Sequence, residues 1–279
     1  MTDAADTVVP QLPLVCEVVC GEPLEEHVEE FRTWAALVWN LTVEALLSSG
    51  TIAQPGDVYN KALWEGVVGT GEPPHVKRRT RLLSARAWAE ALEGDDLRGF
   101  GVTARPLPHV PEPTGTDSTI HLYSGWHSHH IIPNWTSWLL PARYTMAVND
   151  AWVSRLVAGF VAFGTATRAR VGLIGWTWRM WGFKAYPQAK TDYGTVLWLP
   201  GWAMLLSEGH LAKLGGVATL EQSALFRPIE QVGDGTYLVR SRTDLPDFDA
   251  DRLREVESVL QPILLPPPYT EAAAALYRS

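Results

Sequence analysis

Apolar residues recur at helical spacing directly after the first short apolar run of the chain. The run LPLVCEVVCG at 12–21 is rich in β-branched residues and closes with glycine, which predicts a strand. Pro23 and the glutamates that follow it are typical of a helix start, and SSG at 48–50 stops the pattern. The spacing therefore predicts a helix over 24–47, whose apolar face is formed by Leu24, Val28, Phe31, Ala35, Val38 and Leu41.

The middle of the chain alternates between helical and strand-like patterns. We expect a helix over 82–92, and the segments GFGVTARPLP and STIHLYSGW predict strands on either side of a loop at 108–118. Another helix is expected from Asn149 to about Thr167, with Asn149 or Asp150 near its N-cap.

The last part of the chain predicts a further series of strands and helices. RARVGLIGWTWRMW, GTVLWLPGW and TYLVRSRT predict strands, whereas SEGHLAKLGG predicts a short helix ended by glycine. A final helix is expected over 249–260. This order predicts an α+β fold in which antiparallel sheet packs against helices. It leaves open whether two related halves form one compact unit.

The length of 279 residues suits one large domain or two modest ones. The segment at 108–118 is rich in proline, glycine and threonine, so it is the best candidate for a boundary. Such a boundary would separate residues 1–107 from residues 119–279. We favour a single domain over 1–279.

Negative charge is concentrated near the start of the chain. The formal net charge is −8, and residues 1–60 hold ten acidic residues and one basic residue. Nucleic-acid binding usually demands a basic surface, and the one dense basic run, at Lys77–Arg81, is typical of a solvated helix start or loop. The distribution instead favours an acidic face that binds a basic protein.

Four glutamates fall in the first two turns of the helix predicted over 24–47. They are candidate partner-binding residues, because four carboxylates exceed what helix capping requires. Their other interpretation is that they complement the helix dipole and keep the surface soluble. The four residues are Glu25, Glu26, Glu29 and Glu30.

A run of histidines, HLYSGWHSHH, begins at His121. On a strand, His127 and His129 would point the same way and could supply two ligands to zinc or iron. However, Ile131 stands where the His-x-His-x-Asp-His run of metallo-β-lactamase-type hydrolases has aspartate. We therefore expect no metal, no cofactor and no catalytic residue. The cluster then serves packing or partner binding, with Trp126, His127, His129 and His130 as the binding candidates.

The sequence also lacks the motifs of several common enzyme classes and a stretch that could span a membrane. The sequence contains no phosphate-binding P-loop and no G-x-S-x-G nucleophile motif. The start, MTDAADTVVP, lacks the features of a signal peptide, and the longest apolar stretch is too short to span a bilayer. Cys16 and Cys20 are expected to be small buried thiols. We expect a cytoplasmic protein with neither nucleic acid nor membrane as partner.

One arrangement near the C-terminus is similar to a known family. A tryptophan-containing segment leads into a short helix, a glycine turn, a glycine-marked strand pair and a last helix ending in Leu-x-Pro. The matching positions are Trp202, Leu214–Gly216, Asp234–Gly235, Tyr237–Val239 and Leu260–Pro262. This part, Tyr193–Leu264, resembles the end of bacterial immunity proteins of polymorphic-toxin and type VI secretion systems. The resemblance implies a non-catalytic α+β domain that neutralises a cognate protein toxin by binding it.

Two other hypotheses remain open from the sequence. The first is a metal-dependent enzyme that uses His127 and His129. The second is a structural or assembly component whose tryptophans form subunit contacts. The oligomeric state and the identity of the toxin also stay open.

Overall fold

A computed structural model describes ten ranges of the chain. They are residues 14–59, 64–69, 79–81, 84–86, 88–89, 101–106, 120–124, 135–140, 148–176 and 192–265. The predicted loop at 108–118 and residues Trp126 to His130 lie outside these ranges.

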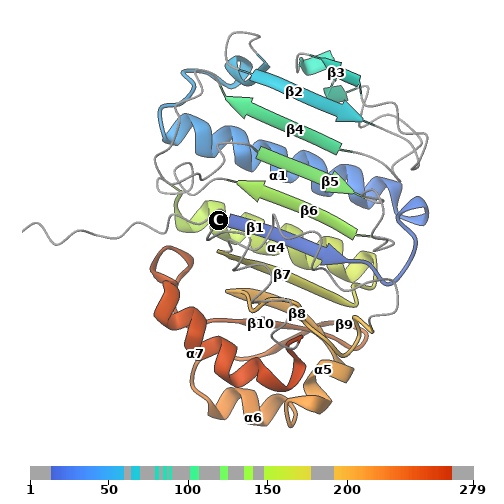
Figure 1. Cartoon of the computed structure of the whole chain (residues 1–279), viewed down its shortest axis with the longest axis vertical. Coiled ribbons are helices and arrows are strands. Elements are labelled where there is room, and N and C mark those ends of the chain that lie inside the picture. Colours follow the sequence, from blue (N-terminus) through green and yellow to red (C-terminus); the bar gives the residue numbers. More distant parts are fainter. Residues whose placement is uncertain are drawn as a thin grey trace, which may run out of the picture.

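The described strands form one ten-stranded antiparallel sheet with helices packed on it, so the fold is α+β as the sequence predicts (Figure 1). The order across the sheet is β3-β2-β4-β5-β6-β1-β7-β8-β10-β9. The strands are β1 Leu14–Val19, β2 Trp64–Gly69, β3 Arg79–Arg81, β4 Gly101–Pro106, β5 Ile120–Ser124, β6 Trp135–Leu140, β7 Val171–Trp176, β8 Ala203–Ser207, β9 Glu230–Gly233 and β10 Thr236–Arg240.

Strand β1 lies in the middle of the sheet between two strands that come much later in the chain. Leu14 is opposite Leu140 of β6 on one side and Trp176 of β7 on the other. All six residues of β1 are buried, which explains why its sequence is a nearly continuous apolar run instead of an alternating one. The first predicted strand is therefore confirmed.

Two long helices, α1 Val28–Ser48 and α4 Asp150–Ala166, pack side by side on one face of the sheet (Figure 1). The indole of Trp152 donates to the carbonyl oxygen of Leu41 at 2.9 Å, and Trp34 stacks on Phe163. Gly159 allows this approach, since a Cβ there would lie 1.9 Å from Cδ2 of Leu37. The predicted cap is also confirmed, because the Asn149 side chain accepts from the backbone N–H of Trp152.

The first long helix starts later than its sequence pattern predicts. Leu24–Glu26 form a separate 3₁₀ turn, η1, and His27 interrupts the helical backbone with φ −129° and ψ 39°. The apolar face itself is confirmed from Phe31 onward, and Leu24 is buried as well. At His27 the chain changes direction on its way from β1 to α1.

Shorter helices follow in the C-terminal part. They are α5 Glu208–Lys213, α6 Val217–Gln222 and α7 Ala250–Leu260, with 3₁₀ turns η5 Leu245–Asp247 and η6 Gln261–Ile263. A further 3₁₀ turn, η2 Pro55–Tyr59, follows α1. The predicted last helix is confirmed, and the Asp249 side chain caps it by accepting from the N–H groups of Asp251 and Arg252.

The prediction of a strand over GTVLWLPGW is wrong. Within this segment Leu197 forms one isolated bridge with Leu264, and the strand β8 starts only at Ala203. The segment runs across the sheet instead of joining it: a Cβ on Gly175 of β7 would lie 3.1 Å from the Cα of Gly201. Pro200 also lacks the N–H that a ladder position requires.

Two other features differ from the sequence expectations or remain untested. Arg79–Arg81 form strand β3, so the prediction of a helix start or loop is wrong for these three residues. The strands before and after residues 108–118 belong to the same sheet. The division at 108–118 and the single-domain organisation both stay predictions.

Candidate partner-binding surface

The strand register brings the ends of several elements to one end of the sheet. Val19, the last residue of β1, lies opposite Val171, the first of β7, and Val171 lies opposite Leu206 near the end of β8. Leu206 in turn lies opposite Tyr237 at the start of β10. The start of α1, the end of α4, the start of α5 and the β9–β10 turn therefore meet at this end (Figure 1).

This end carries more carboxylates than cations, and we call it the acidic end. Its described charged side chains include the carboxylates of Glu22, Glu26, Glu29, Glu30, Glu208 and Asp234 and the guanidiniums of Arg32, Arg168 and Arg170. Glu25 lies in η1 at the same end. The predicted glutamates are thus joined by Glu22, Glu208 and Asp234, which come from other parts of the sequence.

Some of these carboxylates have partners and others do not. Glu22 accepts from Nε2 of His27 at 2.7 Å and lies 3.0 Å from Nη1 of Arg168. Glu29 pairs with Arg32 at 2.6 Å, whereas Glu30 lies 3.9 Å from Nδ1 of His27. Glu26 is exposed and takes part in none of these pairs. The acidic end therefore keeps a negative excess.

Close backbone contacts fix the geometry of the acidic end. The N–H groups of Gly21 and Glu22 both donate to the carbonyl oxygen of Thr167, at 3.0 and 3.3 Å. Gly21 is needed there, because a Cβ would lie 2.2 Å from the carbonyl oxygen of Arg168. At the other side of α4, the hydroxyl of Thr165 donates to the carbonyl oxygen of Val232 in β9 at 3.3 Å. These contacts tie α1, α4 and β9 together.

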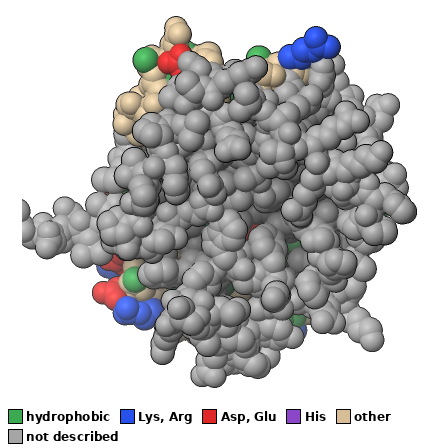
Figure 2. Space-filling model, turned by 45° about the horizontal axis from the view of Figure 1, so that its top comes forward, with side chains coloured by type: hydrophobic (Ala, Val, Ile, Leu, Met, Phe, Trp, Pro, Cys, Tyr) green, Lys and Arg blue, Asp and Glu red, His purple; other side chains and the backbone are tan. Residues whose placement is uncertain are grey.

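Charges elsewhere on the surface are more mixed. The face drawn in Figure 2 carries its described charged side chains in small separate groups, and acidic and basic side chains are adjacent at the lower left. The local excess at the acidic end is therefore not a uniform property of the described surface.

The second group of predicted binding residues cannot be compared with this surface. Trp126, His127, His129 and His130 lie outside the described residues, so their role and the predicted absence of a metal there stay predictions. Among the residues that the structure describes, no group of three or more His, Cys, Asp or Glu side chains is arranged to hold a metal ion.

A buried carboxylate that the sequence reasoning did not single out lies at the centre of the sheet. Glu17 of β1 is fully buried, and the indole N–H of Trp198 donates to its Oε2 at 2.9 Å. Burial, and then the negative charge of Glu17, raise the pKa of Tyr193 and of Cys16. The available signal was the one acidic residue inside the apolar run LPLVCEVVCG. Glu17 anchors the crossing segment at 192–202 to the sheet.

The two cysteines are buried and free, as expected. Burial raises the pKa of Cys20 to about 12, so this thiol is held in its protonated form at neutral pH. A buried thiol of this kind is unsuited to nucleophilic chemistry.

A serine and a histidine lie together at the start of α5, but their contacts are those of a helix cap. Nδ1 of His210 lies 2.9 Å from the hydroxyl oxygen of Ser207, which donates to the carbonyl oxygen of Gly194. Ser207 is the N-cap of α5, and His210 completes a capping box with it. Burial lowers the pKa of His210. The pair therefore fixes α5 against the turn at 192–195.

No protein-family model matches the chain, and no curated protein matches it. Among solved structures it is similar to the Pseudomonas aeruginosa T6SS protein PA0821, with 13% identity and a TM-score of 0.47 over 96% of this chain and 83% of that chain. At this TM-score the similarity does not establish a shared function. Among the described residues, no helix combines the length and apolar character needed to cross a bilayer.

Proposed function

We propose that this chain is a non-catalytic immunity protein, which binds and neutralises a cognate bacterial toxin in the cytoplasm. The observation that carries the proposal is the acidic end of the sheet. Carboxylates from the start of α1, the start of α5 and the β9–β10 turn lie at one surface. Among the described residues Glu26 has no ion-pair partner, and Glu30 has only Nδ1 of His27, at 3.9 Å. A basic toxin domain would find complementary charge there.

The resemblance of Tyr193–Leu264 to immunity proteins supports the same function. Its matching positions lie in packed elements: Trp202 is buried and its indole donates to the carbonyl oxygen of Thr243 at 2.7 Å. Gly235 has φ +66°, the conformation that a tight turn between β9 and β10 requires. These residues pack the C-terminal part of the fold, and a protein that acts by binding needs such a support for its surface.

Co-expression with a candidate toxin tests the proposal. The candidates are proteins with a basic C-terminal domain encoded beside the gene of this chain. We expect the chain to restore growth of cells that express one of them, and to form a stable complex with it in size-exclusion chromatography. If no such toxin is bound or neutralised, the proposal is wrong.

Metal analysis of the purified full-length chain separates this function from the enzyme hypothesis. The immunity function predicts no transition metal held in stoichiometric amount. One equivalent of zinc or iron that disappears when His127 and His129 are both replaced by alanine would favour the metal-dependent enzyme.

A further inference from the structure

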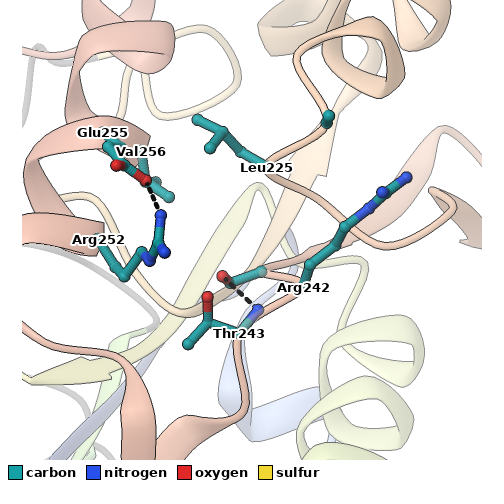
Figure 3. A pocket seen from close by; sticks show the side chains of 8 residues that line it. Leu225, Arg242, Thr243, Arg252, Glu255 and Val256 are labelled. Carbon is teal, nitrogen blue, oxygen red and sulfur yellow. Dashed lines mark hydrogen bonds and ion pairs between the residues drawn. The ribbon is translucent and has the colours of Figure 1, made fainter.

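A small surface pocket lies between α7, the segment that follows β10 and the segment that follows α6 (Figure 3). Its volume is about 210 Å³. Leu225 and Val256 give it an apolar wall, while Ser241, Thr243, Arg252 and Glu255 supply polar groups. Figure 3 shows the Arg252 side chain directed between Glu255 and Thr243.

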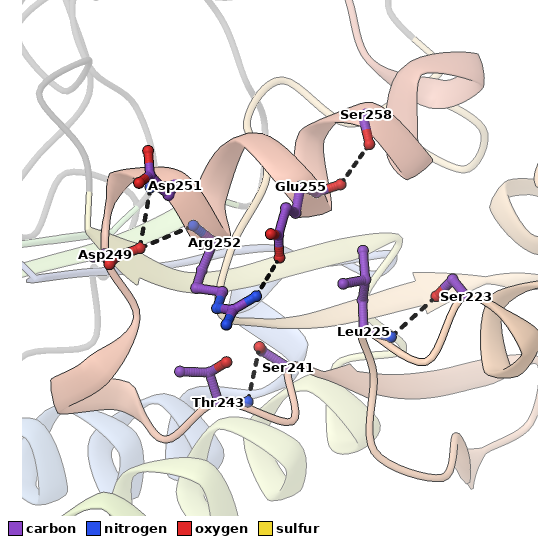
Figure 4. Close-up of polar contacts among 9 residues, drawn as sticks. All are labelled: Ser223, Leu225, Ser241, Thr243, Asp249, Asp251, Arg252, Glu255 and Ser258. Atoms are coloured by element: carbon purple, nitrogen blue, oxygen red, sulfur yellow. Dashed lines mark hydrogen bonds and ion pairs between the residues drawn. The ribbon is translucent and has the colours of Figure 1, made fainter.

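The walls of the pocket are fixed by short-range hydrogen bonds (Figure 4). The hydroxyl of Ser223 accepts from the N–H of Leu225 at 3.3 Å, directly after Ala224, which has φ +58°. On the other side, the hydroxyl of Ser241 accepts from the N–H of Thr243 at 3.2 Å. The backbone N–H of Arg242 donates to the carbonyl oxygen of Leu225 at 2.9 Å, so the two walls are joined.

Some N–H donors of the Arg252 guanidinium are not used within the described part of the chain. Its Nη1 donates to Oε2 of Glu255 at 2.7 Å, which leaves Nε and Nη2 without a hydrogen-bond partner among the described residues. The other nearby carboxylates are already engaged, because Asp251 pairs with Arg254 and Asp249 caps α7. The free edge of the guanidinium and the hydroxyl of Thr243 therefore form a donor group beside an apolar wall.

The free cationic edge of the pocket belongs to Arg252. Arg242 also lines the pocket, but its Nε donates to the carbonyl oxygen of Phe226 at 2.7 Å and its side chain is directed away from Arg252 (Figure 3). An arginine fork binds carboxylates in particular, since two parallel N–H groups match two carboxylate oxygens. Leu225 and Val256 would contact the aliphatic stem that carries such a group.

We propose that this pocket binds a carboxylate side chain, aspartate or glutamate, of the partner protein. Small-molecule sites usually measure about 300–1,000 Å³, so this pocket is better matched to one anchoring side chain. The proposal rests on the proposed function and deepens it. The partner would present basic residues to the acidic end and an acidic residue to this pocket.

A blocked peptide with one central glutamate tests the pocket without the toxin. Its binding to the ¹⁵N-labelled full-length chain is followed by NMR at constant ionic strength, alongside the same peptide with glutamine. We expect saturable shifts at the N–H of Thr243 and at Nε–H of Arg252 with the glutamate peptide. Binding of the glutamine peptide should be at least about tenfold weaker, because a charge-assisted hydrogen bond is lost.

Arg252→Gln and Arg254→Gln form a matched pair for this experiment. Both arginines are exposed on α7 and pair with a carboxylate three residues away, but only Arg252 lines the pocket. Arg252→Gln should weaken glutamate-peptide binding at least about tenfold, and Arg254→Gln should leave it unchanged. No saturable shift in the wild type, or an equal loss in both variants, overturns the proposal.

The affinity of the same two variants for the toxin then tests whether the pocket contacts the partner. Arg252→Gln, compared with Arg254→Gln, should weaken the complex by about tenfold. An unchanged complex would remove the pocket from the interface while leaving the immunity function standing. Conversely, peptide binding without any toxin complex would support the pocket chemistry and contradict the proposed function.

Discussion

The starts of α1 and α7 are both rich in acidic residues, but they present different surfaces. At α1, Glu26 has no ion-pair partner among the described residues, and Glu30 has only Nδ1 of His27, at 3.9 Å. At α7, arginines pair with carboxylates of the acidic run and of the helix turn that follows it. Arg227 pairs with Asp244 and Arg254 with Asp251. Arg252 pairs with Glu255 (Figure 4).

The difference between the two helix starts comes from arginine placement. On α7 two arginines follow or precede their carboxylates by three residues, and Arg227 reaches across from another segment. On α1 only Arg32 is available in this way, for Glu29. A run of carboxylates in a sequence therefore does not by itself predict an acidic surface. The start of α1 can attract a basic partner, whereas at α7 three carboxylates, Asp244, Asp251 and Glu255, are each paired with an arginine.

The largest effect concerns the support beneath the acidic end. Phe31 is fully buried and meets the ring of Phe163 edge to face at 6.5 Å. Phe31→Ala should lower the free energy of unfolding by about 3–5 kcal/mol, as measured by chemical denaturation. On α7 the partly buried Leu253 provides the comparison, and Leu253→Ala should cost less than about 2 kcal/mol. A loss below about 1 kcal/mol for Phe31→Ala would mean that the inner face of α1 is misassigned.

Charge reversal tests the comparison directly. Glu26→Lys with Glu30→Lys should slow association with the cognate toxin several-fold at low salt, and the difference should shrink as ionic strength rises. Asp247→Lys with Glu257→Lys changes the net charge equally at α7 and serves as the control. Stopped-flow association rates measure both. Equal slowing by the two double variants would show that only total charge matters.

Acid should weaken the support of the acidic end through His210, which caps α5 beside Glu208. Because burial lowers the pKa of His210, the folded state favours the neutral ring. This contribution to stability is present above the unfolded-state pKa of about 6.5 and is lost as pH falls through the folded-state value. Urea unfolding at several pH values should show a smaller loss for His210→Gln than for the wild type in that window. Parallel curves would contradict the assignment.

The smallest effect is expected from two arginines that pair with carboxylates at and before the start of α7, Arg227 and Arg254. Arg227→Gln with Arg254→Gln removes two exposed ion pairs and makes α7 resemble α1 in charge. The free energy of unfolding should change by less than about 1 kcal/mol, because exposed ion pairs contribute little. Thermal denaturation measures this. A larger loss would show that these pairs hold α7 in place.

Local sequence signals predicted the elements whose ends are marked by side chains. Asn149 caps a helix where the pattern places it, the last helix lies within the predicted range, and the β9–β10 turn contains Asp234–Gly235. The signals failed where chain geometry is set by distant contacts. The segment around Trp198 has strand-like composition, but it crosses the sheet because its indole binds Glu17, 181 residues away.

The candidate site was predicted in part. The sequence pointed to the glutamates of α1, since they are neighbours along one helix. It could not add Glu208 or Asp234, which join them only through the pairing of β7, β8 and β10. Nor could it predict the pocket beside Arg252, whose walls come from three separate segments.

The sequence by itself determined the α+β class, the presence of the main helices, the N-cap of α4, and the negative charge near the start of the chain. These depend on residues a few positions apart, which interact in any compact state. Tertiary structure alone decided that β1 lies between β6 and β7, that Glu17 is buried, and which carboxylates remain unpaired. The physical reason is that sheet order and charge pairing arise from contacts between distant segments, and no local pattern specifies those contacts.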